Sequence, residues 1–254
     1  MEIYKINSLV ELFFEKYKQK TFINDSPFLK WLKAGKEDFL KWSQVELNIR
    51  ILSEYLRRNI SFGDRCVLLS ENRPEWLIAD ISIMNAGGVT VPLFTTYSEK
   101  DYEYILNDCQ PKICIVSNNL QLKKIEKFVS NKTKILSIEN FNEKIESIEN
   151  ILNNYLKKES NLFPVPLEYN KKINRKDIAC IIYTSGTTGN PKGVMLSHGG
   201  ILSNCEGAQE ILNSLFKKVE PVFLTWLPLS HSYEHTVQYV QISLGAKIYY
   251  AESL

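Results

Sequence analysis

The sequence predicts an α/β fold in which mostly parallel sheets are covered by helices. Helix and strand signals alternate along most of the chain, which is the order expected of β–α units. Residues 178–183 form an almost continuous apolar run, as expected for a strand buried on both faces of a parallel sheet. The 254 residues, 44% of them hydrophobic, suffice for one large domain or two ordinary ones with a sizeable core.

Two capping-box patterns mark the first helices. Ser8 with Glu11 opens a helix that runs through residue 20 with an apolar face. Ser43 with Glu46 opens a second helix, which Gly63 stops. The elements expected next are strands near 66–70, 89–94 and 112–116, a helix after Pro74 and a helix over 99–107.

The composition changes over residues 138–172. This stretch is rich in Asn, Lys and Glu, contains Pro164 and Pro166, and shows little long periodic pattern. We interpret it as a polar bridging segment, a solvated insertion that includes at most a surface helix. It would separate a first α/β subdomain, residues 1–137, from the start of a second, residues 173–254.

A glycine-rich run follows the apolar strand at 178–183. The sequence YTSGTTGNPKGV, residues 183–194, combines four hydroxyls, three glycines and one lysine. Hydroxyls and backbone N–H groups donate hydrogen bonds to phosphate oxygens, glycines let the backbone adopt positive φ and approach an anion, and a lysine adds positive charge. The run therefore predicts a triphosphate-binding loop. Its candidate residues are Thr184, Ser185, Gly186, Thr187, Thr188, Gly189 and Lys192, with Gly193 as the third glycine.

Spacing excludes two better-known phosphate loops. In a Walker loop counted from Gly186, the second glycine would fall at Pro191. The dinucleotide fingerprint G-x-G-x-x-G is also absent from this run. The remaining alternative is a surface hairpin that binds no ligand, which the grouping of hydroxyls, glycines and lysine after a buried strand disfavours.

A second candidate site surrounds His231. Pro228 ends a strand-like run at 222–227, and a helix is expected to begin near Ser230. His231 would then lie at a strand-to-helix corner, where open α/β sheets build ligand sites. From spacing alone a capping or packed histidine is the alternative. Tyr233 and Glu234 would line the same site or simply pack.

Charge, cysteine placement and hydropathy indicate the protein class. Lys plus Arg number 31 and Asp plus Glu 29, so the net charge of +2 gives no nucleic-acid footprint. The five cysteines lie mainly in apolar runs without metal-ligand spacing, which favours reduced core thiols in a cytosolic protein. Asp80 and Asn85 interrupt the longest apolar window, so no transmembrane span is expected there.

The run at 183–194 resembles the phosphate loop of the adenylate-forming, AMP-binding enzymes, which include acyl-CoA synthetases, peptide-synthetase adenylation domains and luciferases. Residues 63–76, 86–106 and 225–236 are similar, in the same order, to blocks of the long-chain fatty acyl-CoA synthetase branch. The resemblance runs from near residue 8 to the last residue. It implies that His231 is the catalytic-site histidine and that the chain corresponds to an incomplete N-terminal domain. Many long-chain members carry Arg where this chain has His235.

The resemblance implies a two-step reaction. ATP and a fatty acid carboxylate give an acyl-adenylate and pyrophosphate, and coenzyme A then displaces AMP to give a thioester. Mg²⁺ would accompany the triphosphate, with no metal ligand assigned in the chain. The family's adenine pocket, ribose-binding Asp and C-terminal lysine domain have no counterpart in this sequence, so the chain alone is expected to be inactive.

Several alternatives remain open at this stage. The chain could be a non-catalytic nucleotide- or acyl-binding fragment or remnant, or part of an enzyme that adenylates another carboxylic acid. For the long-chain ligase, the expected location is the cytoplasm, with peripheral membrane contact to collect a lipid substrate.

Overall fold

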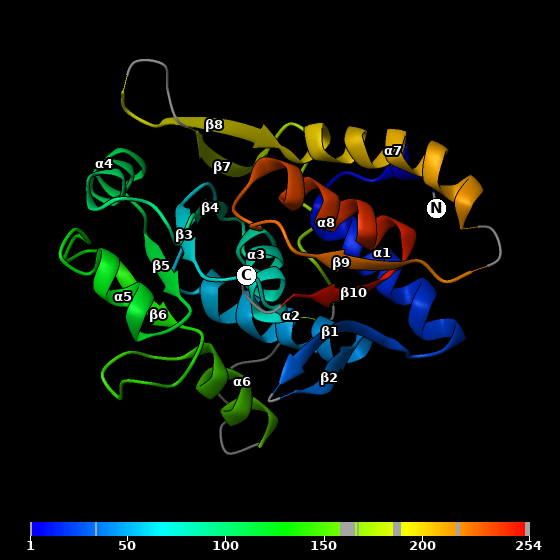
Figure 1. Cartoon of the computed structure of the whole chain (residues 1–254), viewed down its shortest axis with the longest axis horizontal. Helices are drawn as coiled ribbons and strands as arrows, with labels where there is room; N and C mark the ends of the chain where they lie inside the picture. The colour runs from blue at the N-terminus through cyan, green and yellow to red at the C-terminus, as the bar shows by residue number, and fades with distance from the viewer. Residues whose placement is uncertain are drawn as a thin grey trace.

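The computed structural model describes residues 2–33, 35–157, 166, 168–184, 189–216 and 219–251. These residues form two mainly parallel sheets with helices packed between and over them, which confirms the predicted α/β class (Figure 1). All five cysteines are free and buried, as expected for core thiols.

The larger sheet carries most of the buried parallel strands. Its spatial order is β6-β5-β3-β4-β7-β8, with every neighbouring pair parallel except the final β7–β8 hairpin. Its strands are β3 (Arg65–Leu69), β4 (Val89–Leu93), β5 (Ile113–Val116), β6 (Lys134–Ser137), β7 (Ile178–Thr184) and β8 (Lys192–Ser197). The expected strands near 66–70, 89–94 and 112–116 are therefore present.

The smaller sheet joins the two ends of the chain. Its order is β2-β1-β10-β9, and β1 runs parallel to β10 with Leu29 opposite Ile248. Its strands are β1 (Pro27–Lys33), β2 (Lys36–Lys41), β9 (Val222–Thr225) and β10 (Lys247–Tyr250). The division at 1–137, 138–172 and 173–254 stays a prediction, and neither sheet follows its boundaries because each combines strands from both outer ranges.

Helices cover these sheets, and α3 lies between them in contact with β3 and β4 of one and β1 of the other (Figure 1). Because α3 is surrounded, all its residues except Glu75 are buried, and Asp80 is the charged residue among them. The helices are α1 (Leu9–Ile23), α2 (Trp42–Arg57), α3 (Pro74–Asn85), α4 (Glu99–Cys109), α5 (Asn119–Ile125), α6 (Ile148–Leu156), α7 (His198–Leu215) and α8 (Ser232–Leu244).

One of the two predicted helix starts is wrong. Ser8 caps α1 by accepting the N–H of Glu11, as its capping box predicts. Ser43 instead lies inside α2, whose N-cap is Lys41, and its hydroxyl donates to Asp25 at 2.6 Å. The aromatic ring of Trp42 explains the earlier start, because it stacks on Phe28 of β1 and so draws the first turn into the core.

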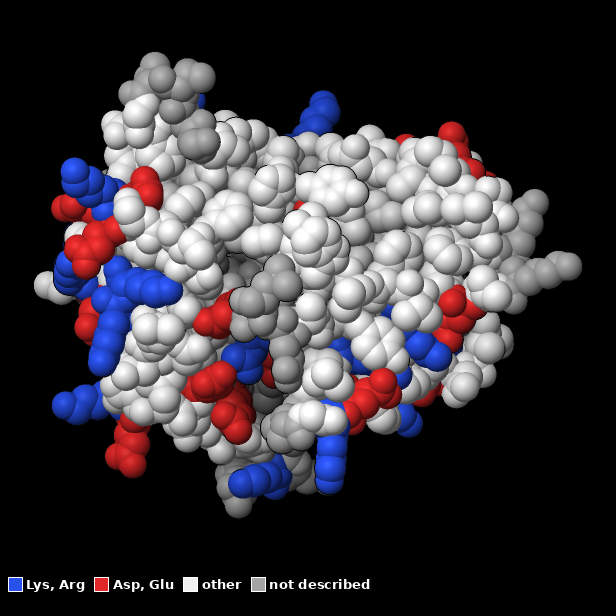
Figure 2. All heavy atoms as spheres, viewed as in Figure 1, with Lys and Arg blue, Asp and Glu red and all other residues white. Residues whose placement is uncertain are grey.

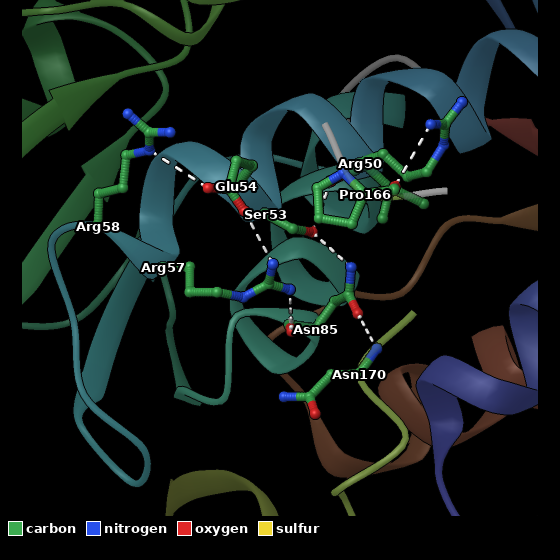
Figure 3. Close-up of polar contacts among 9 residues, drawn as sticks. Arg50, Ser53, Glu54, Arg57, Arg58, Asn85, Pro166 and Asn170 are labelled. Carbon is green, nitrogen blue, oxygen red and sulfur yellow. Dashed lines mark hydrogen bonds and ion pairs between the residues drawn. The ribbon is translucent and has the colours of Figure 1, made fainter. Parts of the chain in front are cut away.

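The described end of the bridging segment is fixed to the helical layer. The backbone N–H of Asn170 donates to Asn85 Oδ1 at 2.8 Å, and Asn85 Nδ2 donates to Ser53 Oγ at 2.9 Å (Figure 3). Arg57 adds a donor to the Asn85 carbonyl. These contacts join α2, the end of α3 and the described end of the bridging segment at Asn170, while α6 supplies the surface helix that the sequence allowed.

Candidate functional site

The glycine-rich run connects the two strands of an antiparallel hairpin. Thr184 ends β7, Lys192 begins β8, and the two residues are paired across the hairpin. We call residues 184–192 the phosphate loop. Ser185, Gly186, Thr187 and Thr188 lie outside the described residues, so their predicted contacts stay predictions. Lys192 is exposed at the base of the loop, where an anion in solvent can reach its side chain.

The two described glycines serve different purposes. Gly189 has φ of +101°, a conformation that favours glycine and agrees with the predicted need for backbone freedom. Gly193 does not adopt positive φ, so that part of the expectation is wrong. A Cβ at Gly193 would lie 2.9 Å from Ile181 Cγ2 and 3.1 Å from the Tyr183 ring, so glycine is required there by packing against β7.

His231 occupies the predicted strand-to-helix corner. It is the N-cap of α8, and its Nδ1 accepts the backbone N–H of Tyr233 at 3.1 Å. In the neutral ring the proton must then lie on Nε2, which can donate to a ligand oxygen. The ring also makes an edge contact with Phe94, with 6.2 Å between centroids. His231 thus caps the helix through Nδ1, while its Nε2 can donate a hydrogen bond to a ligand.

Asn72 holds the segment before His231 in place. Its Nδ2 donates to the Leu227 carbonyl at 2.7 Å, and its Oδ1 accepts the Leu229 N–H at 2.9 Å. Asn72 follows β3, so it ties the carboxyl edge of the larger sheet to the segment that follows β9. Sequence reasoning did not assign it a role. The available signal was the polar run Ser70-Glu71-Asn72 directly after a buried strand.

A pocket of about 340 Å³ opens beside this contact. Residues 70–72, the turn after β4, residues 226–228, Ser230 and Ala251 line it. Its walls include Phe94, Trp226 and Leu227, and Glu71 is the one charged residue among those that line it. Partial burial opposes ionisation of Glu71, but hydrogen bonds from Ser117 and Gln121 outweigh it and lower its pKa. The pocket is therefore apolar with one negative edge, which disfavours an anion.

The surface around the pocket is correspondingly poor in charge. Figure 2 shows little red or blue on the face over β9 and α8, whereas Lys and Arg mix with Asp and Glu near the lower and left margins. The side chains of Leu224 on β9, Trp226 just after it and Tyr233 on α8 are exposed. Glu234, in contrast, is buried, and that burial raises its pKa. Of the two residues predicted to line the site or to pack, Tyr233 is therefore exposed and Glu234 is packed in the interior.

Two further histidines are packed in the interior. His198 accepts the backbone N–H of Leu9 at its Nδ1, and burial lowers its pKa to about 4. His235 pairs with Asp80 at 2.8 Å inside the core. Neither contact involves the pocket, whereas the ring of His231 contacts Phe94, which lines it. The catalytic role of His231 stays a prediction. Among the described residues no group of His, Cys, Asp and Glu could hold a metal ion.

A family model described as AMP-binding enzyme matches residues 13–254 of the chain. The chain belongs to the AMP-binding enzyme family. It is 31% identical over 240 residues to fatty acyl-CoA synthetase A of Dictyostelium discoideum, covering 89% of this chain and 35% of that protein. It is 30% identical over 196 residues to long-chain-fatty-acid–CoA ligase 5 of Rattus norvegicus, covering 71% and 28%. The chain thus spans about a third of these curated relatives.

Solved structures of a luciferase and of a fatty acyl-adenylate ligase share the fold. A luciferase from Phrixothrix hirtus superposes with a TM-score of 0.79 at 17% identity, covering 98% of this chain and 47% of the luciferase. A fatty acyl-adenylate ligase from L. pneumophila, solved with acyl adenylate and pyrophosphate, gives 0.74 at 22% identity and covers 99% and 40%. The architecture is therefore that of adenylate-forming enzymes. No described helix is long and apolar enough to cross a membrane.

Proposed function

We propose that this chain forms the phosphate- and acyl-binding part of an ATP-dependent long-chain fatty acid–CoA ligase. One observation carries the proposal: the lysine-bearing loop follows β7, and the helix-capping His231 contacts Phe94, which follows the neighbouring parallel strand β4, so both features lie at the carboxyl edge of the larger sheet. Ligands of open α/β sheets bind at this edge. The sequence relationship to long-chain acyl-CoA synthetases supports the fatty acid over other carboxylic acids.

The phosphate loop suits the phosphates of ATP, and the apolar pocket suits the acyl chain of the fatty acid. Lys192 and the loop hydroxyls would hold the β- and γ-phosphates of ATP, where positive charge offsets the departing pyrophosphate. The pocket at Phe94 and Trp226 would take the uncharged acyl part, since its one charged residue, Glu71, repels anions. His231 Nε2 would donate to an oxygen where carboxylate and α-phosphate meet. A fatty acid carboxylate is already ionised at pH 7, so the histidine orients it and need not remove a proton.

The reaction needs no covalent intermediate on the protein. The carboxylate oxygen attacks the α-phosphorus, pyrophosphate leaves, and the thiol of coenzyme A then forms the thioester as AMP departs. Alignment of the reactants supplies much of the rate in such a displacement. Mg²⁺ would travel with the triphosphate and offset its charge.

Binding of MgATP to the 254-residue chain is the direct test. We expect measurable binding by calorimetry, weakened about tenfold or more in Lys192→Ala, because a charge-assisted contact to phosphate is lost. Lys36→Ala is the matched control, since Lys36 also begins a strand and is exposed, and it should leave the affinity unchanged. Equal affinities of the wild type and Lys192→Ala would refute the assigned role.

A second assay separates the proposed functions. ATP–pyrophosphate exchange with palmitate should be absent in the 254-residue chain and present in a protein that adds the remaining two thirds of the relatives' length. Exchange that needs an aryl or amino acid would instead favour another adenylating enzyme. MgATP binding without exchange in either protein would favour a non-catalytic nucleotide-binding role. The cytoplasmic location and peripheral membrane contact belong to this same proposal.

A further inference from the structure

We propose that Tyr97 and Phe94 are positioning residues that join the end of β7 to His231. They would fix the position of the phosphate loop relative to His231, so that both can contact the same bound substrate. The functional meaning of this bridge rests on the proposed ATP chemistry. The bridge itself is a structural relationship that can be tested without any ligand.

The first link is a hydrogen bond to the backbone beside the loop. The hydroxyl of Tyr97 donates to the carbonyl of Tyr183 at 2.8 Å, one residue before the phosphate loop begins. The Tyr183 hydroxyl is itself bonded to Asp108 on α4. The end of β7 is therefore tied to the segment after β4 by the Tyr97 hydroxyl and to α4 by the Tyr183 hydroxyl.

The second link is a pair of edge-on ring contacts. The Phe94 ring lies 5.2 Å from the Tyr97 ring and 6.2 Å from the imidazole of His231, measured between centroids. Edge-to-face contacts at these separations contribute a specific geometry as well as apolar burial. Phe94 also lines the apolar pocket, so it contacts the histidine and the proposed acyl site at once.

The turn that carries both rings is itself fixed. The hydroxyl of Tyr102 donates to the Phe94 carbonyl at 2.8 Å, and Lys124 Nζ donates to the Thr95 carbonyl at 2.7 Å. The turn is thus held by hydrogen bonds from α4 and from α5. A braced turn transmits a displacement at one end to the other, because its backbone has little freedom to absorb it.

The chain has three histidines, so the NMR signal of each can be followed and a change at His231 can be told from one elsewhere. In histidine-labelled, ligand-free protein, Tyr97→Phe should move the NMR signal of His231 and leave those of His198 and His235 in place. Tyr169→Phe is the matched control, since it removes a hydroxyl bonded to Glu11 on α1, and it should leave the His231 signal in place. Both variants should keep the wild-type thermal midpoint within a few degrees. An unmoved His231 signal in folded Tyr97→Phe would overturn the bridge.

A ligand arm distinguishes failure of the bridge from failure of the proposed function. Mg-pyrophosphate is the probe, because it needs only the phosphate loop. We expect Tyr97→Phe to weaken its binding about fivefold, the usual effect of one neutral hydrogen bond, and Tyr169→Phe to leave it unchanged. Wild-type affinity in Tyr97→Phe would contradict the bridge. Absence of binding to the wild type would contradict the proposed phosphate site, while the ligand-free spectra still decide whether the bridge exists.

Discussion

Asp80 of α3 and His235 of α8 form an ion pair across 2.8 Å, and both side chains are almost completely excluded from solvent. Tyr239, one turn further along α8, donates to the same carboxylate oxygen at 2.5 Å. Burial disfavours the charged imidazole, but the charge of Asp80 and a contact with Cys180 outweigh it and raise the pKa of His235 to about 10. This pair anchors α8 one turn from His231.

Removing the carboxylate should destabilise the protein strongly. Asp80→Asn keeps the shape of the side chain but removes the charge that compensates a buried imidazolium, so we expect a loss on the order of 3 kcal/mol in the free energy of unfolding. Urea denaturation measures it. The matched change Asp38→Asn, at a half-buried position on the edge strand β2, should cost less than about 0.5 kcal/mol. Equal stability of the two variants would show that the buried pair contributes nothing.

The same pair predicts how stability depends on pH. The folded pKa of His235 lies above the ordinary value of 6.5, so the folded protein keeps a proton that the unfolded chain releases. The pair's contribution is complete below about pH 6.5 and is lost as pH rises toward 10. The slope is at most about 1.4 kcal/mol per pH unit.

Lys16 limits the pH range in which the contribution of His235 to stability can be measured. Burial, followed by the nearby charge of Lys20, lowers the pKa of Lys16 to about 8, so above that pH it opposes the trend from His235. The decline should therefore be clearest between pH 6.5 and 8. Urea midpoints across this window should fall in the wild type and remain flat in Asp80→Asn. A wild-type curve parallel to that of Asp80→Asn would mean that His235 is not held protonated.

The contribution of His198 to stability should depend on pH in the opposite sense to that of His235. Burial lowers the pKa of His198 to about 4, against the partial opposition of Asp177 and Asp80. The unfolded chain therefore takes up a proton that the folded protein refuses, and this contribution to stability is lost as pH falls from 6.5 toward 4. Histidine-selective NMR in native protein should show one signal that begins to titrate only near pH 4. His198→Gln identifies that signal, and a midpoint near 6.5 for it would contradict the buried, neutral assignment.

The sequence predicted elements more readily than long-range partners. The corner at His231 could be predicted because a proline, an apolar run and a capping segment are local signals. The pairing of His235 with Asp80 could not, because 155 residues separate them and the sequence shows only an isolated charge in an apolar helix. The pairing of β1 with β10 was missed for the same reason. The capping box at Ser43 predicted the wrong start of α2, because the tertiary stacking of Trp42 on Phe28 outweighed the local capping signal.

Gly193 offers a test of how tightly the base of the phosphate loop is packed. A methyl group at this position would meet Ile181 Cγ2 at 2.9 Å and the Tyr183 ring at 3.1 Å. Neither neighbour yields easily, because isoleucine is stiff at Cβ and the Tyr183 hydroxyl is bonded to Asp108. We therefore expect Gly193→Ala to lower the free energy of unfolding by about 1–3 kcal/mol.

Gly207 is the matched control for that substitution. It lies in α7 with nothing within 4 Å of the position of a Cβ, so Gly207→Ala should stabilise the helix by up to about 1 kcal/mol. The two alanine variants should thus move the urea midpoint in opposite directions. If Gly193→Ala were as stable as the wild type, β8 would have to lie further from β7, and the pairing that brings Lys192 opposite Thr184 would be looser than the structure shows.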